Sequence, residues 1–198
     1  MNERQTWDSA ALRAIAEYRT KTGESYVGQV HLKAVEKALR CAEAKILRVL
    51  KTDLWNEGIE LGRDILGMLE DDRSLSLVGV DLSAIVCQRA KSRLKRTDII
   101  QASIRRLPIK DEHFDVVLDF STIDHVVPDE IPTVIREYRR ALKNSGIMLV
   151  SFWHPARILK LIGALGRASY PQYYLDTRRM RALIGRGFDI VEEYNTLG

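Results

Sequence analysis

The sequence predicts an α/β protein with a doubly wound, Rossmann-like, mostly parallel sheet, helices on both faces and an N-terminal helical extension. Three observations support this prediction. From residue 46 onward, short apolar runs alternate with segments of helical periodicity. The run 114–120 is almost continuously apolar, as expected for a strand that is covered on both faces. Strands that alternate with helices also imply right-handed crossovers, and therefore parallel strands.

Two helices are expected before the sheet, at residues 6–20 and 29–45. In the second of them, apolar residues recur at the three-to-four-residue spacing of one buried face. No linker rich in Pro or Ser follows. We therefore expect residues 1–45 to form an N-terminal helical cap of the same domain, and residues 46–198 to form the Rossmann-like core.

The core is expected to contain five strands, at residues 46–50, 75–80, 98–102, 114–120 and 147–153. The helices between them are expected at residues 57–69, 84–94 and 130–142. Ser83 is the expected cap of the second of these helices. Gly146 follows the third and suits the left-handed conformation found after a helix. A further helix at 176–187 and a strand at 188–194 are expected near the end of the chain.

The segment 156–168 combines apolar residues with Arg and Lys. This pattern is typical of an amphipathic helix. Two interpretations remain open: a lid that covers a pocket, or a segment that makes peripheral contact with a membrane surface.

Composition narrows the class of protein. A chain of 198 residues with 45% hydrophobic and 29% charged residues can bury one full core. No apolar run approaches the roughly 20 residues of a membrane-spanning helix, and the first residues lack the apolar centre of a secretory signal. Cys41 and Cys87 are not spaced as a metal or redox motif, so both are expected to be reduced, in a cytoplasmic protein.

The charged and metal-binding residue types exclude further classes. The four histidines have no metal-ligand spacing, so no metal site is expected. The net charge of +4 is mildly basic, and the excess lies in local groups that are not interleaved with aromatic residues. Solvated helix faces explain these groups better than specific nucleic-acid binding.

The stretch 77–83 carries the strongest functional signal. An apolar run ends at Asp81, and Ser83 follows two positions later. In doubly wound folds, an acid at this place accepts the ribose hydroxyls of a nucleoside-containing cofactor. The alternative is an ordinary α/β protein in which this segment only begins a helix.

The residues that follow extend this pattern into an ordered set of motifs. After Asp81 come Leu107-Pro108, then the run Phe-Asp-Val-Val at 114–117, and then Leu-Lys-Asn-Ser-Gly at 142–146. This succession resembles the class I S-adenosylmethionine-dependent methyltransferases, in particular their small-molecule branch. The resemblance covers roughly residues 45–155. It implies S-adenosyl-L-methionine as cofactor and methyl transfer to a small or lipid-like acceptor.

Two features depart from the pattern of the family. The family usually has a glycine-rich turn after the first strand, whereas residues 51–58 here read Lys-Thr-Asp-Leu-Trp-Asn-Glu-Gly. Trp55 therefore occupies the turn. In addition, Ser103 stands where the family commonly has an acid that contacts the adenine amino group.

The altered turn can still be interpreted physically. Asp53, Asn56 and Glu57 place acceptors, two of them anionic, after the first strand. Carboxylates repel the pyrophosphate of a dinucleotide but suit the ammonium and sulfonium groups of S-adenosylmethionine. This argues against NAD, as does the lack of a Tyr-x-x-x-Lys pair. The alternatives are that Asp53 or Asn56 only caps the next helix, or that the pocket has been lost.

The resemblance and the residues together give a predicted site. The expected cofactor-binding residues are Asp53, Asn56, Glu57, Asp81, Leu82, Ser103, Ile104, Asp119 and Ser121. An oxygen or nitrogen acceptor is helped by a nearby base, and the candidates are His125 with Asp124 beside it. The competing interpretation is that His125 caps or packs its helix. His154 is a weaker candidate at the same edge.

Two other functions stay open. The glycine-poor turn and Ser103 also fit a non-catalytic module with the methyltransferase fold. The basic net charge fits an RNA methyltransferase. However, the Asn/Asp-Pro-Pro-Tyr motif of many base-amino methyltransferases is missing after residue 120. The family fold usually closes with a hairpin of two strands, of which the sequence offers only the first, so a truncated chain is a further expectation.

Overall fold

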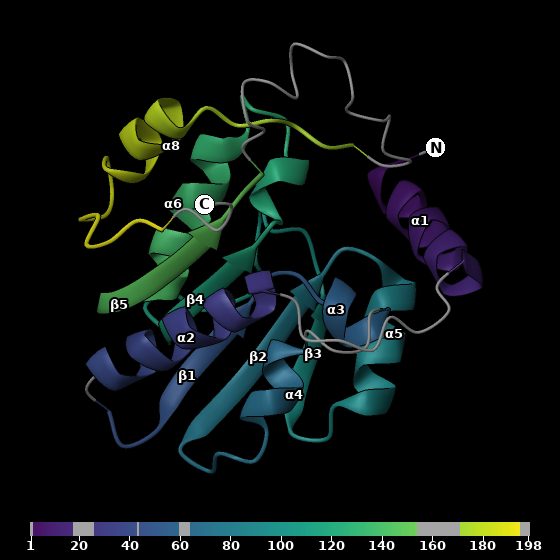
Figure 1. Cartoon of the computed structure of the whole chain (residues 1–198), viewed down its shortest axis with the longest axis horizontal. Coiled ribbons are helices and arrows are strands. Elements are labelled where there is room, and N and C mark those ends of the chain that lie inside the picture. The colour runs from purple at the N-terminus through teal and green to yellow at the C-terminus, as the bar shows by residue number, and fades with distance from the viewer. Residues whose placement is uncertain (1, 18–25, 43, 60–63, 154–170, 195–198) are drawn as a thin grey trace.

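A five-stranded, entirely parallel sheet forms the centre of the molecule (Figure 1). The computed structural model describes residues 2–17, 26–42, 44–59, 64–153 and 171–194. The strand order is β3-β2-β1-β4-β5. The strands are β1 (Leu47–Lys51), β2 (Leu75–Asp81), β3 (Thr97–Gln101), β4 (Phe114–Phe120) and β5 (Leu142–Ser151). The predicted fold class is therefore confirmed, and the strand order reverses between β1 and β4, where ligands of open sheets bind.

Alternating side chains on the strands feed two separate hydrophobic cores, one on each face of the sheet. Leu47, Val49 and Leu77 lie in the first core, and Leu50 and Val80 in the second. Residues of four helices close the first core: α1 (Glu3–Glu17), α2 (Tyr26–Cys41), α4 (Ile65–Leu69) and α5 (Ala84–Arg93). Residues of two helices close the second core: α6 (Ile131–Ala141) and α8 (Thr177–Ile184). All seven residues of β4 are buried, as its apolar run predicts.

Helices α1 and α2 pack on the first core. Ala11 and Ala14 of α1 and Val35 and Ala38 of α2 are buried in the same cluster as the strands β1 and β2. The two helices thus share a hydrophobic core with the sheet, while the proposed division at residue 45 stays a prediction.

The prediction of one continuous helix over residues 57–69 is wrong. The structure has a short helix α3 (Trp55–Gly58) and a separate helix α4, and residues 60–63 lie outside the described part of the chain. Asp64 begins α4 by accepting a hydrogen bond from the Gly67 backbone N–H at 2.6 Å. A side-chain acceptor of this kind starts a new helix.

Two predictions near the end of the sheet are also wrong. Strand β5 begins at Leu142, directly after α6, and Gly146 lies within it rather than in a left-handed turn. The pairing of β5 with β4 shifts its register between Phe114 and Val116, which accommodates the extra residues at the start of β5. Pairing between the two strands therefore prevails over the turn that the local sequence favours. Residues 188–194 form no strand, and Val191 is 93% exposed, because an apolar alternation without a paired neighbour does not make a strand.

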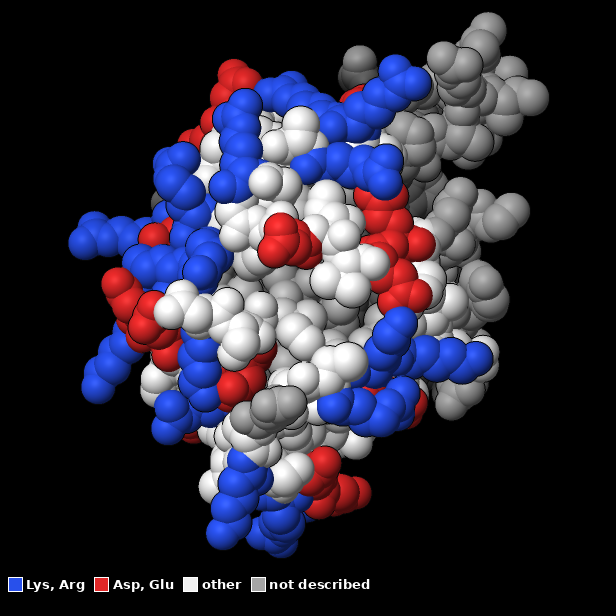
Figure 2. Space-filling view, turned by 90° about the vertical axis from the view of Figure 1, so that its left-hand side faces the viewer, with Lys and Arg blue, Asp and Glu red and all other residues white. Residues whose placement is uncertain are grey.

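Charged side chains of both signs cover the face of the molecule that Figure 2 shows. Lys and Arg are dense in the upper part of the face in Figure 2, where α8 lies. Several of them are paired with acids: Arg179 lies 3.5 Å from Asp129, and Arg181 lies 2.6 Å from Glu193. The surface is thus one of mixed charge.

The findings on membrane-spanning helices and metal sites concern only the described residues. Among the described residues, no helix is long and apolar enough to cross a membrane, and no group of His, Cys, Asp or Glu could hold a metal ion. The predicted segment 156–168 and His154 lie outside the described residues.

Candidate functional site

Asp81 ends β2 at the carboxyl edge of the sheet, as predicted. Its Oδ2 accepts a hydrogen bond from the Leu54 N–H at 3.0 Å, and its Oδ1 accepts one from the Ser83 N–H at 2.8 Å. Ser83 caps α5 through Val86, so this part of the prediction is confirmed. Burial, reinforced by the charge of Asp53, raises the pKa of Asp81 to about 7. Two backbone donors therefore hold the carboxyl group of this half-buried residue at the edge of the sheet.

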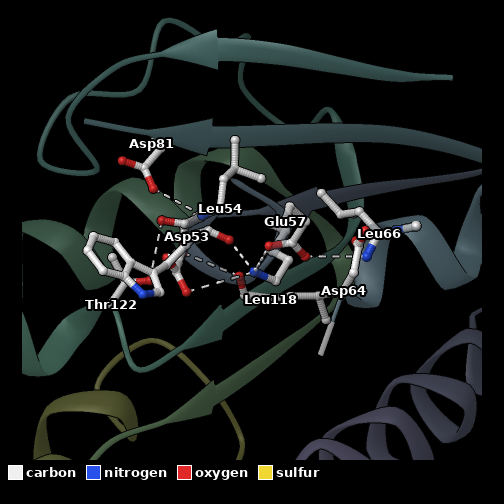
Figure 3. A network of polar contacts seen from close by, with 12 residues as sticks. Asp53, Leu54, Glu57, Asp64, Leu66, Asp81, Leu118 and Thr122 are labelled. Atoms are coloured by element: carbon white, nitrogen blue, oxygen red, sulfur yellow. Dashed lines mark hydrogen bonds and ion pairs between the residues drawn. The ribbon is translucent and has the colours of Figure 1, made fainter. Parts of the chain in front are cut away.

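The turn after β1 brings a second acid to the same edge (Figure 3). Asp53 is half-buried, and its Oδ1 accepts a hydrogen bond from the Trp55 N–H at 2.8 Å. Leu54 is fully buried and packs close to Gly79 of β2, where an added Cβ would lie 2.5 Å from the Leu54 side chain. Only a glycine in β2 allows this approach. The turn is thereby fixed against β2 without a glycine of its own.

Beneath this turn lies a buried ion pair. Lys51, the last residue of β1, and Glu57 of α3 are both fully buried, and Lys51 Nζ lies 3.0 Å from Glu57 Oε2. Nζ also donates to the backbone oxygen of Asp53. Burial raises the pKa of Glu57 to about 7, although the charge of Lys51 opposes this. The structure thus places Glu57 differently from the prediction: its carboxylate faces Lys51 and the Leu66 N–H rather than the edge of the sheet.

Asp119 near the end of β4 is also fully buried. Its Oδ1 accepts hydrogen bonds from the Thr122 N–H at 2.8 Å and the Ile123 N–H at 3.2 Å. Its Oδ2 accepts one from the Tyr138 hydroxyl at 2.7 Å, and that hydroxyl also lies 3.2 Å from Thr52 Oγ1. Burial raises the pKa of Asp119 to about 6. In this structure Asp119 stabilises the turn after β4, and its predicted contact with a ligand stays a prediction.

The remaining predicted cofactor residues lie around the same edge. Ser121 has a φ of 67°, in the left-handed region that L-residues rarely adopt, and such strain is often found at functional sites. Asn56, Leu82 and Ser103 are half-buried, whereas Ile104 is buried in the second core. Contact of these residues with a cofactor stays a prediction.

The two predicted catalytic residues occupy different environments. Asp124 is fully buried, and its backbone oxygen accepts a hydrogen bond from the Tyr173 N–H at 2.7 Å. Burial raises the pKa of Asp124. His125 is half-buried, and its Nδ1 lies 2.7 Å from the Pro171 backbone oxygen. A carbonyl oxygen only accepts hydrogen bonds, so Nδ1 carries the proton, and Nε2 is the basic nitrogen of the neutral ring.

The N-terminal helix α1 supplies a side chain that the sequence did not reveal. The Trp7 ring lies edge-on to the His125 ring, with centroids 4.8 Å apart, and edge-on to the Trp55 ring at 6.3 Å. Asp8, the next residue, accepts a hydrogen bond from the Ser83 hydroxyl at 2.6 Å. Helix α1 therefore places an aromatic side chain between the turn after β1 and the residues after β4.

The site combines negative charge with aromatic surface. Asp53, Asp81 and Glu57 carry three negative charges when ionised, and Lys51 carries one positive charge. The local sum of −2 favours a ligand with positive charge and disfavours a phosphate. Trp7 and Trp55 supply faces that attract cations and planar apolar groups. The chemistry of these side chains therefore fits a cationic nucleoside cofactor.

Comparisons with known proteins show which proteins this chain is similar to. The model of a methyltransferase domain family matches residues 62–150. A probable S-adenosylmethionine-dependent methyltransferase of Mycobacterium tuberculosis is 32% identical over 75 residues, which are 38% of this chain and 27% of that protein. Residues 62–150 therefore belong to the methyltransferase domain family, and S-adenosylmethionine-dependent methyltransferases are among the proteins that this chain resembles.

Two further proteins are similar to this chain, one in sequence and one in fold. The malonyl-[acyl-carrier protein] O-methyltransferase of Halorhodospira halophila is 28% identical over 121 residues, which are 60% of this chain and 40% of that protein. The 1,6-didemethyltoxoflavin-N1-methyltransferase of Burkholderia thailandensis, solved with S-adenosylhomocysteine, superposes with a TM-score of 0.65 at 17% identity and covers 92% of this chain and 76% of its own. The matched parts span 27% and 40% of the lengths of the two sequence relatives.

Sequence reasoning found the edge of the sheet but missed part of the site. It placed Asp53 and Asp81 together, and the structure brings Asp81, at the end of β2, against the turn after β1 that carries Asp53. It missed Lys51, Trp7 and Tyr138. The one available signal was the position of Lys51 directly after an apolar run. A Lys at such a position is almost never fully buried unless it is paired, so a buried partner could have been expected.

Proposed function

We propose that this protein transfers the methyl group of S-adenosylmethionine to a small organic or lipid-like acceptor. The observation that carries the proposal is the pair of acids at the carboxyl edge of the sheet, with Asp81 held by two backbone donors and Asp53 beside it. An acid at the end of β2 suits two ribose hydroxyls. The Asp53 carboxylate suits the ammonium group of the methionyl part.

The protein has little bond chemistry to perform in such a reaction. S-adenosylmethionine supplies a methyl group that is already activated by its positive sulfur. The task of the chain is then to bind both molecules, to hold the acceptor atom in line and to exclude water. Trp7 and Trp55 provide an apolar wall for this purpose, and the closely packed helix α1 carries one of them.

His125 is the proposed base for an acceptor that loses a proton. Its Nδ1 is held by the Pro171 oxygen, which fixes the tautomer and leaves Nε2 as the basic nitrogen. Asp124 is buried beside it, and Gln172 Nε2 donates to its Oδ2 at 3.4 Å. We assign Asp124 a positioning role in this proposal, because its carboxyl group is closed off from solvent.

A small acceptor group, either free or attached to a carrier, is supported by the aromatic wall and by the relatives. The Halorhodospira relative is named for a carrier-bound malonyl group, and the Burkholderia structure is named for a small heteroaromatic acceptor. The mixed charges over α8 give less support to an RNA acceptor. The acceptor class is tested with methyl-labelled S-adenosylmethionine and a panel of free acids, carrier-bound acids, phenols and bulk RNA.

Isothermal titration with S-adenosylhomocysteine tests cofactor binding. Wild-type protein is expected to bind with a Kd in the micromolar range, and Asp81→Ala is expected to weaken binding by tenfold or more, because both ribose contacts are lost. Asp98→Ala, which removes an exposed acid of β3, is the matched control and should leave the affinity unchanged. No heat and no thermal shift at millimolar ligand would refute the proposal and would favour a non-catalytic module with this fold.

A further inference from the structure

The fully buried lysine at the end of β1 has no role in the function proposed above. A lysine ammonium without water costs several kcal/mol of folding free energy unless other groups in the protein compensate it. The Lys51 side chain has 0% exposure, and its Nζ donates to the backbone oxygen of Asp53 in the turn after β1. The groups that surround Lys51 must therefore compensate the cost of burying its charge.

Among the described residues, the hydrogen-bond and ion-pair partners of the Lys51 ammonium belong to the turn or to the helix that follows it. Nζ donates to the Asp53 backbone oxygen, lies 3.8 Å from Asp53 Oδ2 and lies 3.0 Å from Glu57 Oε2. Burial alone lowers the pKa of Lys51, but the charges of Glu57 and Asp53 outweigh it and raise that pKa above its ordinary value. The ammonium group of Lys51 therefore contacts both the main chain and the side chain of Asp53, as well as the carboxylate of Glu57.

The same turn is tied to β2 at its next residue. The Leu54 N–H donates to Asp81 Oδ2 at 3.0 Å, and the Trp55 N–H donates to Asp53 Oδ1 at 2.8 Å. Lys51 thus completes a chain of contacts that runs from Glu57 through Asp53 to Asp81. A glycine-rich turn lets a ligand approach the backbone, and this turn presents a side-chain carboxylate instead.

We propose that Lys51 is a positioning residue for the cofactor, which holds the Asp53 carboxylate where it receives the ammonium group of the methionyl moiety. Glu57 serves as the counter-ion that makes the buried lysine tolerable. This inference rests on the function proposed above, because it concerns the same cofactor site.

The charge balance supports this assignment. Glu57 neutralises Lys51, which leaves the charges of Asp53 and Asp81 uncompensated. Repulsion between these two acids is one cause of the raised pKa of Asp81. A cationic group that binds at Asp53 relieves this repulsion, and an uncharged group does not. Lys51 should therefore matter for the charged part of the cofactor and not for its adenosine part.

Two ligands distinguish binding of the amino-acid part of the cofactor from binding of its adenosine part. S-adenosylhomocysteine carries the ammonium group, whereas 5′-methylthioadenosine has the same adenosine and thioether but no amino-acid moiety. Titrations compare both ligands on wild-type protein, Lys51→Met and the double variant Lys51→Met/Glu57→Met. The double variant leaves no unpaired buried charge, and such replacements are often neutral for stability. Its ligand affinities can therefore be measured even if the single variant fails to fold.

The expected result is a selective loss. In both variants, affinity for S-adenosylhomocysteine falls by tenfold or more, and affinity for 5′-methylthioadenosine changes less than threefold. Asp53→Asn reproduces the same selectivity. Arg93→Met is the matched control: Arg93 donates to the Glu57 backbone oxygen and lies 3.4 Å from Asp64, but touches no atom of Asp53, so its loss should change both affinities by the same factor.

The contrary results are distinct. If both ligands weaken equally in the Lys51 variants, or if neither weakens, Lys51 only supports the fold and the inference is wrong. If Asp53→Asn is selective and the double variant is not, Asp53 acts without Lys51, and the proposed function survives alone. If wild-type protein binds neither ligand, the proposed function itself fails.

Discussion

Asp81→Asn should make the ligand-free protein more stable at high pH and should leave its stability nearly unchanged at pH 5. The reason is the raised pKa of the Asp81 carboxyl group, which at about 7 lies about three units above the ordinary value of 3.8. Because the folded state holds this proton more tightly than the unfolded state, the stability that the group contributes is present at low pH. That stability is lost as the pH rises from about 4 through about 7.

The magnitude follows from the size of the shift. Three pKa units at about 1.4 kcal/mol each give an upper limit of about 4 kcal/mol for keeping Asp81 ionised at pH 8. The side chain is partly exposed, so solvent screening reduces this figure. Asn accepts one of the two backbone hydrogen bonds and loses the other, at a cost of about 1 to 2 kcal/mol. We therefore expect a net gain of about 1 to 2 kcal/mol at pH 8.

Thermal unfolding of both proteins from pH 5 to pH 8.5 measures this effect. For a chain of this length, the expected gain corresponds to an increase in Tm of about 2 to 8 °C at pH 8. The difference should shrink steadily toward pH 5, because Asp81 binds its proton as the pH falls, whereas the cost of the lost hydrogen bond stays constant. A Tm difference that is constant with pH, or an Asn variant that is less stable at pH 8, would contradict the raised pKa and the charge repulsion between Asp53 and Asp81.

Three further predictions concern the surroundings of the site. Tyr138→Phe removes the hydroxyl that donates to buried Asp119 and should lower the free energy of unfolding by about 1 to 3 kcal/mol, as measured by denaturant titration. Gly79→Ala brings a Cβ to 2.5 Å from Leu54, so it should cost about 1 to 3 kcal/mol of stability and weaken S-adenosylhomocysteine binding; unchanged affinity would show that Leu54 does not fix the turn. Asp8→Ala removes the partner of the Ser83 hydroxyl and should loosen α1, which acrylamide quenching of tryptophan fluorescence would report as greater access to Trp7.

The parts of the fold that local sequence determines were predictable. Apolar runs located the five strands, and the capping serine at 83 located the start of α5, because both signals lie within a few residues of the element they define. The acid at the end of β2 was found for the same reason. Asp64 was missed as a helix start, because it lies within an apparently continuous helical pattern.

Features that depend on contacts between distant segments were not predictable. Lys51 is buried only because Glu57 and the Asp53 backbone meet it after the chain has turned. Trp7 reaches His125 across 118 positions of sequence, and no local pattern encodes that contact. Glu57 was placed at the edge of the sheet because sequence order puts it beside Asp53, whereas the geometry of α3 directs it inward.

A structure of the protein with bound S-adenosylhomocysteine tests the central claim most directly. The account predicts the ribose hydroxyls within hydrogen-bond distance of the Asp81 carboxylate, the ammonium group against Asp53, and the Trp55 ring alongside the ligand. It would be contradicted by a ligand bound elsewhere on the protein, or by a Trp55 ring that fills the space beside Asp81 while saturating ligand is present.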